Sequence, residues 1–317
     1  MRVLFIADHH IKLGQKNVPK KWSRSRFKGA WNKVAKLATD NNIATIFHGG
    51  DIFDAVPSTE ELQIYGEMLN ILKDFTNIIY PGNHEAINKR HSFLEHLAPL
   101  SKAYVVNNYM PEAEVLSSFG IPNSAILPYT DLKTKVWHKD KGEILFSHVR
   151  GAIPPHVESE IDLKLLANWE TVYAGDLHSH KLCQENIIYP GSPMATTFRR
   201  SLGSGDNGIL IIDTEINSWE FVDLELPQLL KRTVYAEKDV IKTTPHHTAY
   251  ELVGAETSMS KVADKDLVAK KMSNVEVEQE GIILRATNIE DELVEYLTKK
   301  EGIEEPNKYV SLMRDIV

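Results

Sequence analysis

Cysteine is nearly missing from this 317-residue chain, in which Cys183 is the only one. A single thiol cannot form an intrachain disulfide, and proteins without disulfides are typical of reducing compartments. Long apolar runs are missing too, since none approaches the roughly 18 residues that a membrane helix needs. The strand-like run from Arg2 to Ala7 is too short for the apolar core of a signal peptide. We therefore expect a cytoplasmic protein without a membrane span.

The motifs of two common enzyme classes are also missing. The sequence has no P-loop lysine motif and no Gly-x-Ser-x-Gly elbow, which argues against ATP hydrolysis and serine-nucleophile chemistry by this chain. The stretch from Gly203 to Gly208 has the glycine spacing of a dinucleotide-binding turn, but it precedes a strand-like run and opens no helix. We interpret it as a loop.

Acidic residues are missing from one stretch of an otherwise acidic protein. The net charge is −8, yet the stretch from Lys12 to Lys36 contains nine Lys and Arg residues and no Asp or Glu. Such a concentration of positive charge attracts anions. Trp22, Phe27 and Trp31 are interleaved with the charges, but Phe27 and Trp31 also fit the buried stripe of an amphipathic helix whose charges form a solvated face.

Short apolar runs alternate with helical patterns through the first half of the chain, which predicts an α/β fold. The stretch from Ser58 to Glu61 is typical of a capping box at the start of a helix. Strands are expected at Val3–Ala7, Ile43–Phe47, Ile78–Tyr80, Ile144–Phe146, Val172–Ala174 and Ile187–Tyr189.

The pattern changes near Gly208, where two strand-like runs read as a hairpin that closes a first domain before Pro227. Beyond it, strand-like pieces at 233–236, 275–278 and 282–284 flank a charged helical pattern near 261–271. The last thirty residues carry eight acids against four bases. We expect a first domain at 1–226, a smaller α+β capping domain at 227–287, and a C-terminal helical segment at 288–317.

Polar residues follow five of the expected strands directly. Because the loops at the carboxyl ends of neighbouring strands converge in an open α/β sheet, these side chains can meet although they are far apart in sequence. Carboxylates, an amide and imidazoles without a thiolate suit Mn, Fe, Mg or Zn. The motifs are Asp8-His-His10, Gly50-Asp51, Gly82-Asn-His-Glu85, Ser147-His148 and Gly175-Asp-Leu-His-Ser-His180.

Each motif is weak alone, since a chain with 13 histidines can contain one His-x-His by chance. Their order and their placement after strands together predict a dinuclear metal site. Over roughly residues 1 to 224, these motifs resemble the calcineurin-like metallophosphoesterase family. Within it, the chain is similar to the nuclease subunit of SbcCD-type DNA repair complexes and their phage recombination counterparts. The features that carry this similarity are Asp8-x-His10 near the start of the sequence, Gly82-Asn-His-Glu85, and Tyr189-Pro-Gly-Ser-Pro193 after the His-x-His.

The resemblance implies a fold and a role for each matching residue. The fold would be a two-sheet sandwich flanked by helices. Asp8, His10 and His180 would bind one divalent metal ion, and Asn83, His148 and His178 would bind the other. Asp51 would bridge the two ions, and His84 would face the scissile phosphate. Asp54 stands where the family's second motif has a histidine, and we expect Asp54 and His48 to lie behind the ligands.

The resemblance also implies an activity and partners. We expect a metal-dependent DNA nuclease, exonucleolytic on duplex ends and endonucleolytic on single strands, that uses Mn²⁺, with Mg²⁺ or Fe²⁺ as alternatives. It would act in repair or recombination with an SMC-like ATPase bound by the C-terminal segment, in a bacterial cell or a phage-infected host, and could form a homodimer. Candidate DNA contacts are Lys12, Lys16, Lys20, Lys21, Arg24, Lys89, Arg90, Arg199 and Arg200.

Two other functions remain open at this point. A phosphomonoesterase or a cyclic-nucleotide phosphodiesterase would use the same metal site on a smaller substrate. A non-catalytic scaffold that tethers DNA ends would keep the fold, although it would have no need for a complete ligand set. The relative rates of cleavage of DNA and of a small aryl phosphate distinguish these cases.

Overall fold

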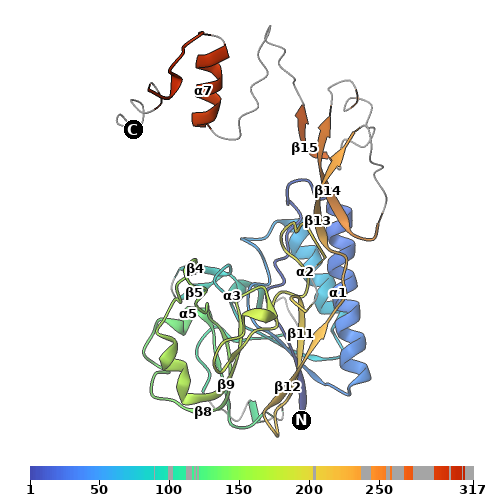
Figure 1. Cartoon of the computed structure of the whole chain (residues 1–317). Coiled ribbons are helices and arrows are strands. Elements are labelled where there is room, and N and C mark those ends of the chain that lie inside the picture. Colours follow the sequence, from blue (N-terminus) through green and yellow to red (C-terminus); the bar gives the residue numbers. More distant parts are fainter. Residues whose placement is uncertain are drawn as a thin grey trace.

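Two β-sheets form the centre of the N-terminal part of the chain (Figure 1). The computed structural model describes residues 1–88, 90–98, 103–111, 116–117, 119, 121–202, 205–236, 244–254, 258, 268–273, 289–299, 301–308 and 310. The six-stranded sheet has the order β12 (Ser218–Asp223), β11 (Gly208–Asp213), β1 (Arg2–Ile6), β2 (Thr45–His48), β3 (Thr76–Ile79) and β6 (Tyr104–Val105). The four-stranded sheet has the order β10 (Ile187–Ile188), β9 (Trp169–Gly175), β8 (Gly142–His148) and β7 (Ser124–Leu127).

The two sheets pack face to face through aromatic side chains. The rings of Phe47 and Phe146 stack with centroids 4.1 Å apart, and Phe5 and Tyr173 each lie 5.8 Å from the Phe146 ring. Strands β1, β2 and β3 run parallel in register, with Phe5 opposite Phe47. Strands β7, β8, β9 and β10 are also parallel. The carboxyl ends of both sets of strands can therefore carry one site.

Helices cover the outer faces of this sandwich. Helices α1 (Lys20–Asp40) and α2 (Thr59–Ile71) bury Trp31, Val34 and Met68 against Leu4 and Ile46 of the six-stranded sheet. The segment containing α5 (Tyr129–Leu132) and η2 (Leu163–Asn168) covers the outer face of the other sheet, where Trp137 and Leu166 pack on Leu145 and Val172. The expected two-sheet α/β sandwich is confirmed.

Local sequence signals explain much of this arrangement. The Ser58 side chain accepts a hydrogen bond from the Glu61 amide, and Glu61 reaches back to the Ser58 amide, so both halves of the predicted capping box form. In α1, Phe27 and Trp31 lie on the buried face, which confirms that they belong to the amphipathic stripe. The hairpin of β11 and β12 pairs antiparallel with β1, so the end of the predicted first domain completes the same sheet as its beginning.

Short elements decorate the loops between the main strands. Strands β4 (Ala86–Asn88) and β5 (His91–Ser92) form a small ribbon before helix α3 (Leu94–Leu97). The 3-10 turn η3 (His180–Leu182) follows β9. No described helix is long and apolar enough to span a bilayer.

A three-stranded parallel sheet follows the sandwich: β13 (Leu229–Tyr235), β14 (His247–Gly254) and β15 (Val268–Ser273). It stands beside one end of α1 in Figure 1, where the Trp22 ring lies 5.2 Å from the His247 ring. The prediction of a helix near 261–271 is wrong for residues 268–271, because these residues belong to β15, which pairs with β14. Cross-strand pairing outweighs the weak local preference of such a short segment.

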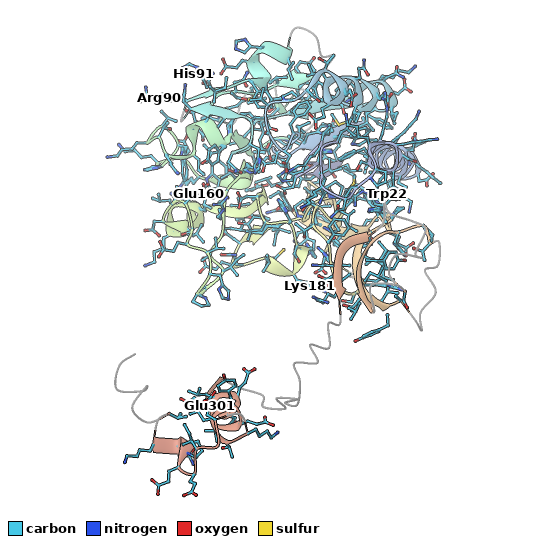
Figure 2. All side chains as sticks on the ribbon, turned by 90° about the horizontal axis from the view of Figure 1, so that it is seen from above. Trp22, Arg90, His91, Glu160, Lys181 and Glu301 are labelled. Atoms are coloured by element: carbon cyan, nitrogen blue, oxygen red, sulfur yellow. The ribbon has the colours of Figure 1, made fainter. Side chains whose placement is uncertain are left out.

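The C-terminal part contains helix α7 (Ile289–Lys299), which lies apart from the sandwich in Figure 1 and, with Glu301, in Figure 2. The strand-like pieces expected at 275–278 and 282–284 lie outside the described residues. The domain limits at 226 and 287 stay predictions.

Candidate metal centre

Polar side chains from five strand ends meet at one edge of the sandwich. Asp8 follows β1, and Asp51 follows β2. The loop after β3 carries Asn83 and His84, and β8 ends at His148. His178 comes three residues after the end of β9. The placement after strands that the sequence indicated thus brings these side chains together.

The backbone of these loops is held in unusual conformations. Asp8, His10, Asp51 and Asp176 have positive φ values of 55°, 45°, 51° and 100°. Positive φ is costly for residues with a side chain and persists only where neighbouring contacts enforce it. Here the amides of Asp8 and His10 donate to Gly50 O and Asp51 O at 3.0 and 2.9 Å. These hydrogen bonds hold the loop after β1 against the loop after β2.

Glu85 is the link between two of these loops. Its buried carboxylate accepts hydrogen bonds at 2.9 Å from the amides of Asp51, Phe53 and Gly82. Burial, and then repulsion from Asp51, raise the pKa of Glu85 to about 7. The last residue of the Gly82-Asn-His-Glu85 motif thus ties the loop of Asp51 to the loop of Asn83.

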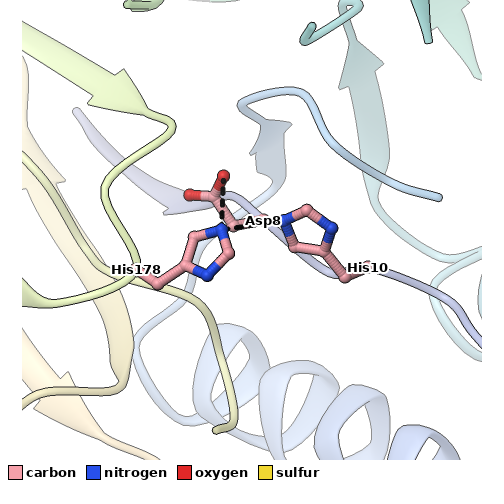
Figure 3. Close-up of side chains that lie close together, drawn as sticks. All are labelled: Asp8, His10 and His178. Carbon is pink, nitrogen blue, oxygen red and sulfur yellow. Dashed lines mark hydrogen bonds and ion pairs between the residues drawn. The ribbon is translucent and has the colours of Figure 1, made fainter. Parts of the chain in front are cut away.

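One group of ligand atoms comes from Asp8, His10 and His178 (Figure 3). His10 Nε2 lies 2.9 Å from His178 Nε2, and His178 Nε2 lies 4.0 Å from Asp8 Oδ1. His10 Nε2 is also 3.6 Å from Asp51 Oδ2. Nitrogen and carboxylate atoms that converge in this way have the geometry of a transition-metal site.

A second group of ligand atoms surrounds His148. Its Nε2 lies 3.5 Å from Asp51 Oδ1 and 3.8 Å from Asp176 Oδ1. One end of the Asn83 amide lies 2.9 Å from His148 Nε2 and 3.2 Å from both Asp51 Oδ2 and Asp176 Oδ1. Asp51 faces both groups, as a bridging carboxylate must.

Three histidine rings present Nε2 to the centre because their Nδ1 atoms are engaged elsewhere. His148 Nδ1 donates to Gly49 O at 2.8 Å, and His84 Nδ1 donates to Asp54 O at 2.5 Å. His178 Nδ1 lies 3.2 Å from the Thr196 hydroxyl. A hydrogen bond at one ring nitrogen fixes the tautomer and leaves the other nitrogen as a ligand or a proton carrier.

The electrostatics favour a cation at this centre. Burial raises the pKa of Asp8 well above its usual value, and the nearby Asp51 and Asp176 raise it further. Burial lowers the pKa of His178 to about 4, so this ring is neutral near pH 7. Burial also disfavours the charged form of His148, but attraction from Asp51, Asp8 and Asp176 outweighs it and raises the pKa to about 9. Buried carboxylates that repel one another and a neutral imidazole fit a divalent metal ion.

Asp54 and His48 were both expected to lie behind the metal ligands, but the structure places them in different surroundings. Asp54 Oδ1 lies 3.4 Å from His10 Nδ1, its Oδ2 accepts from Lys12 Nζ at 2.5 Å, and its carbonyl accepts from His84. The hydrogen bond with His10, followed by Lys12, keeps the pKa of Asp54 far below its usual value. His48 instead faces His9 at 3.1 Å and Asn77 at 3.0 Å in the buried layer beneath α1.

The structure does not bring His180 to the centre as the sequence suggested. Its Nδ1 lies 2.6 Å from Tyr189 O, and its ring stacks on Phe221 at 4.1 Å. The chain turns between the two histidines, so His178 takes the place beside Asp8 and His10 that had been expected for His180. Asp176 stands beside His148 and Asn83, where His178 had been expected.

Asp176 is the site residue that sequence reasoning missed. Its amide donates to Asp8 Oδ1 and Oδ2 at 3.0 and 3.2 Å, so the β9 loop is fastened to the β1 loop. The sequence contained a signal that Asp176 belongs to the site, because this residue directly follows β9, much as Asp8 closely follows β1. The His-x-His pattern two residues later offers two more familiar ligands in the same loop, and spacing alone does not choose among the three.

A cavity of about 230 Å³ opens onto this centre. It is lined by Asp51, Asn83, His84, Arg150, Val157, Asp176, Leu177 and His178. The His84 side chain is partly exposed there, and its Nε2 lies 3.8 Å from Asp51 Oδ2. The side of the centre formed by Asp51, Asn83, Asp176 and His178 is thus open to a substrate.

The candidate DNA contacts do not form one patch. Lys12, Lys20, Arg24, Arg199 and Arg200 form ion pairs with Asp54, Glu60, Glu67, Asp206 and Glu251. Lys16 and Lys21 are exposed. Arg90 lies on the opposite side of the sandwich from Trp22 of α1 (Figure 2), and Lys89 lies outside the described residues.

Comparison with known proteins agrees with this geometry. Residues 1–191 match the family model of the calcineurin-like phosphoesterases. The chain is 37% identical over 281 residues to the "Probable exonuclease subunit 1" of Escherichia phage T5, covering 86% of this chain and 85% of that protein. A likeness to the TT1561 protein of Thermus thermophilus has a TM-score of 0.42 at 12% identity and covers 71% of this chain and 99% of the other. Likeness at that level does not extend to function. The family match and the phage relative show that the chain belongs to the calcineurin-like phosphoesterase family.

Proposed function

We propose that this protein is a metal-dependent DNA nuclease that hydrolyses phosphodiester bonds, as an exonuclease on duplex ends and an endonuclease on single strands. The observation that carries the proposal is the buried group of Asp and His side chains around Asp51, in a chain 37% identical to a phage protein named as an exonuclease subunit. Its role would lie in DNA repair or recombination.

The residues present fit two divalent cations that share Asp51. Asp8, His10 and His178 would hold one, and Asn83, His148 and Asp176 would hold the other. The cations are Mn²⁺ in this proposal, with Mg²⁺ or Fe²⁺ as alternatives, because imidazole and carboxylate ligands accept all three. When bound, such a pair neutralises charge on a phosphodiester and lowers the pKa of the attacking water.

His84 is the residue proposed to act on the leaving group. Its Nδ1 is fixed by Asp54 O, and its ring is 35% exposed beside Asp51 in the cavity. An imidazole held in this way can protonate a leaving oxygen or stabilise negative charge on the phosphoryl group. The ring contacts His10 edge-on at 4.8 Å between centroids, which limits its movement.

The proposal includes a partner, DNA contacts and a location. The phage relative is named as a subunit, which supports a complex with another subunit. In this proposal the other subunit is an SMC-like ATPase that binds the C-terminal segment. Lys16, Lys21 and Arg90 are exposed candidates for phosphate contacts outside the ion pairs named above. They are favoured because the ion-paired Lys and Arg side chains are already partly neutralised. We place the protein in the cytoplasm of a bacterial or phage-infected cell, where it could also form a homodimer.

The proposal is tested by comparing substrates at equal enzyme concentration. Purified protein with Mn²⁺, Mg²⁺ or Fe²⁺ is given an end-labelled duplex, a labelled single strand and a small aryl phosphate. Faster cleavage of DNA than of the aryl phosphate, lost in the Asp51→Asn variant, supports the nuclease. Faster cleavage of the aryl phosphate or of a cyclic nucleotide indicates a general phosphoesterase. DNA binding without any hydrolysis indicates a tethering scaffold.

A further inference from the structure

Arg150 lies at the edge of the metal centre and makes a bidentate contact with the carboxylate of Asp176. It comes two residues after His148, and its Nε and Nη2 atoms donate to Asp176 Oδ2 and Oδ1 at 2.9 and 3.0 Å. The Arg150 side chain is 37% exposed, whereas that of Asp176 is 3% exposed. Both side chains line the cavity that opens onto Asp51.

The two hydrogen bonds fix the plane of the Asp176 carboxylate. A guanidinium fork matches both oxygens of a carboxylate, which a lysine ammonium cannot do. In this plane, Oδ1 of Asp176 points toward His148 Nε2, 3.8 Å away, and toward the Asn83 amide, 3.2 Å away. Each carboxylate oxygen can accept more than one interaction, so Oδ1 remains able to bind a cation.

A carboxylate ligand at this position gains from such support. An Asp side chain rotates about two bonds and has two equivalent oxygens. A ligand held by a fixed neighbour binds a metal ion more tightly, because less freedom is lost on binding.

We propose that Arg150 is a positioning residue whose bidentate contact holds Asp176 in the orientation that binds the second metal ion. The inference rests on the proposed metal-dependent function and on the assignment of Asp176 to that ion. If Arg150 has this role, the affinity for the second metal ion depends on the two hydrogen bonds of its guanidinium group, and not only on a positive charge at position 150.

The test is a Mn²⁺ titration by calorimetry on the full-length protein, which needs no substrate. Arg150→Ala and Arg150→Lys are each expected to weaken the second binding event by about tenfold or more, the usual effect of losing a residue that supports a ligand. The first event should be unchanged in both variants. Lys231→Ala is the matched control. Lys231 is 38% exposed, like Arg150, and forms an ion pair of 2.8 Å with Glu251 in the sheet of β13 and β14.

A double-mutant comparison separates positioning from other roles. In an Asp176→His background the fork has no carboxylate to hold, so Arg150→Ala should no longer weaken the second event. Circular dichroism melts check that each variant is folded, and Arg150→Lys keeps the test open if Arg150→Ala is unstable.

Several outcomes would overturn the inference. If Arg150→Lys binds Mn²⁺ like the wild type, charge and not orientation is what matters. If both variants bind Mn²⁺ like the wild type but bind DNA more weakly, then Arg150 contacts a DNA phosphate and does not position Asp176. If the wild type binds two Mn²⁺ ions but cuts no DNA, the proposed nuclease function is wrong. The inference about Arg150 is then decided by the Mn²⁺ titration alone.

Discussion

Asp51 is the residue that faces both halves of the metal centre, with His10 Nε2 at 3.6 Å from one oxygen and His148 Nε2 at 3.5 Å from the other. Replacing it with Asn removes the negative charge between two cations, so their repulsion is no longer offset. We expect Asp51→Asn to lose cleavage and at least one of two bound ions per chain. Metal analysis of the dialysed protein measures this, with Asp40→Asn on the surface of α1 as control. Two retained ions and activity near that of the control would contradict the dinuclear assignment.

His84 lies beside the ligands, and we expect it to act on the substrate without holding a metal ion. His84→Gln should keep Mn²⁺ stoichiometry and DNA affinity and lower the cleavage rate by about 10²-fold, the usual scale for a lost general acid. Single-turnover cleavage and a Mn²⁺ titration on the same preparation separate chemistry from binding. His91→Gln, on an exposed strand nearby, should behave like the wild type. Loss of a metal ion in His84→Gln would make His84 a ligand.

At the scale of elements, a buried chain of polar side chains joins β1, β2, β3 and α1. Trp31 donates from α1 to His9, His9 faces His48, and His48 faces Asn77. Asn77 in turn donates to the carbonyls of Leu72 and Phe75. All of these groups find partners with the histidines neutral, so the sheet accepts them at little cost as long as no proton is added.

This chain of side chains predicts a loss of stability in mild acid. Burial lowers the pKa of His48 to about 4, below its usual 6.5. The unfolded chain therefore takes up a proton first as pH falls, and stability that is present above pH 6.5 is lost progressively toward pH 4. At pH 5 the loss from His48 is about 2 kcal/mol, at about 1.4 kcal/mol per pKa unit.

Urea unfolding of the metal-free protein at pH 7.5 and pH 5 measures this effect. The decrease between the two pH values should be about 2 kcal/mol smaller in His48→Gln than in the wild type. His156→Gln, at an exposed position, should retain the full decrease. An equal decrease in all three proteins would show that His48 is not held neutral by the fold.

At the scale of the whole molecule, we expect the C-terminal segment to bind the ATPase partner. Helix α7 lies apart from the sandwich (Figure 1). It has three acidic residues in its first turn, and their negative charge stabilises the N-terminus of the helix. Its helically spaced apolar residues are Ile289, Leu293, Tyr296 and Leu297, and all four residues of a second stripe, Tyr309, Met313, Ile316 and Val317, lie outside the described residues. Truncation after Thr287 should leave Mn²⁺-dependent cleavage of short single strands intact, while ATP-stimulated cleavage of duplex ends is lost.

Co-purification with the ATPase is the direct measurement. The truncated chain should lose it, and so should full-length Leu293→Asp, whereas Thr298→Asp on the exposed side of α7 should not. Full recovery of the ATPase by the truncated chain would contradict a docking role. A truncated chain that is unfolded by circular dichroism would make the segment part of the fold.

Local signals in the sequence predict where the main strands end and which polar residues follow them. Apolar runs bounded by turn residues and a capping box are local signals, so they predicted β1, β2, β3, β8, β9 and the start of α2 to within a few residues. Asp8, Asp51 and Asn83 could be identified as site residues because they lie in loops at the carboxyl ends of parallel strands, and such loops converge on one crevice.

Which of Asp176, His178 and His180 face the centre depends instead on long-range contacts in the folded chain. These residues lie in one loop, and their directions depend on contacts with distant partners: Asp8 for the Asp176 amide, Thr196 for His178, and Tyr189 and Phe221 for His180. The same reason explains the basic stretch, whose charges are partly neutralised by Asp54, Glu60 and Glu67 from another part of the chain. Spacing along a sequence fixes periodicity, whereas side-chain direction and charge pairing depend on what packs alongside.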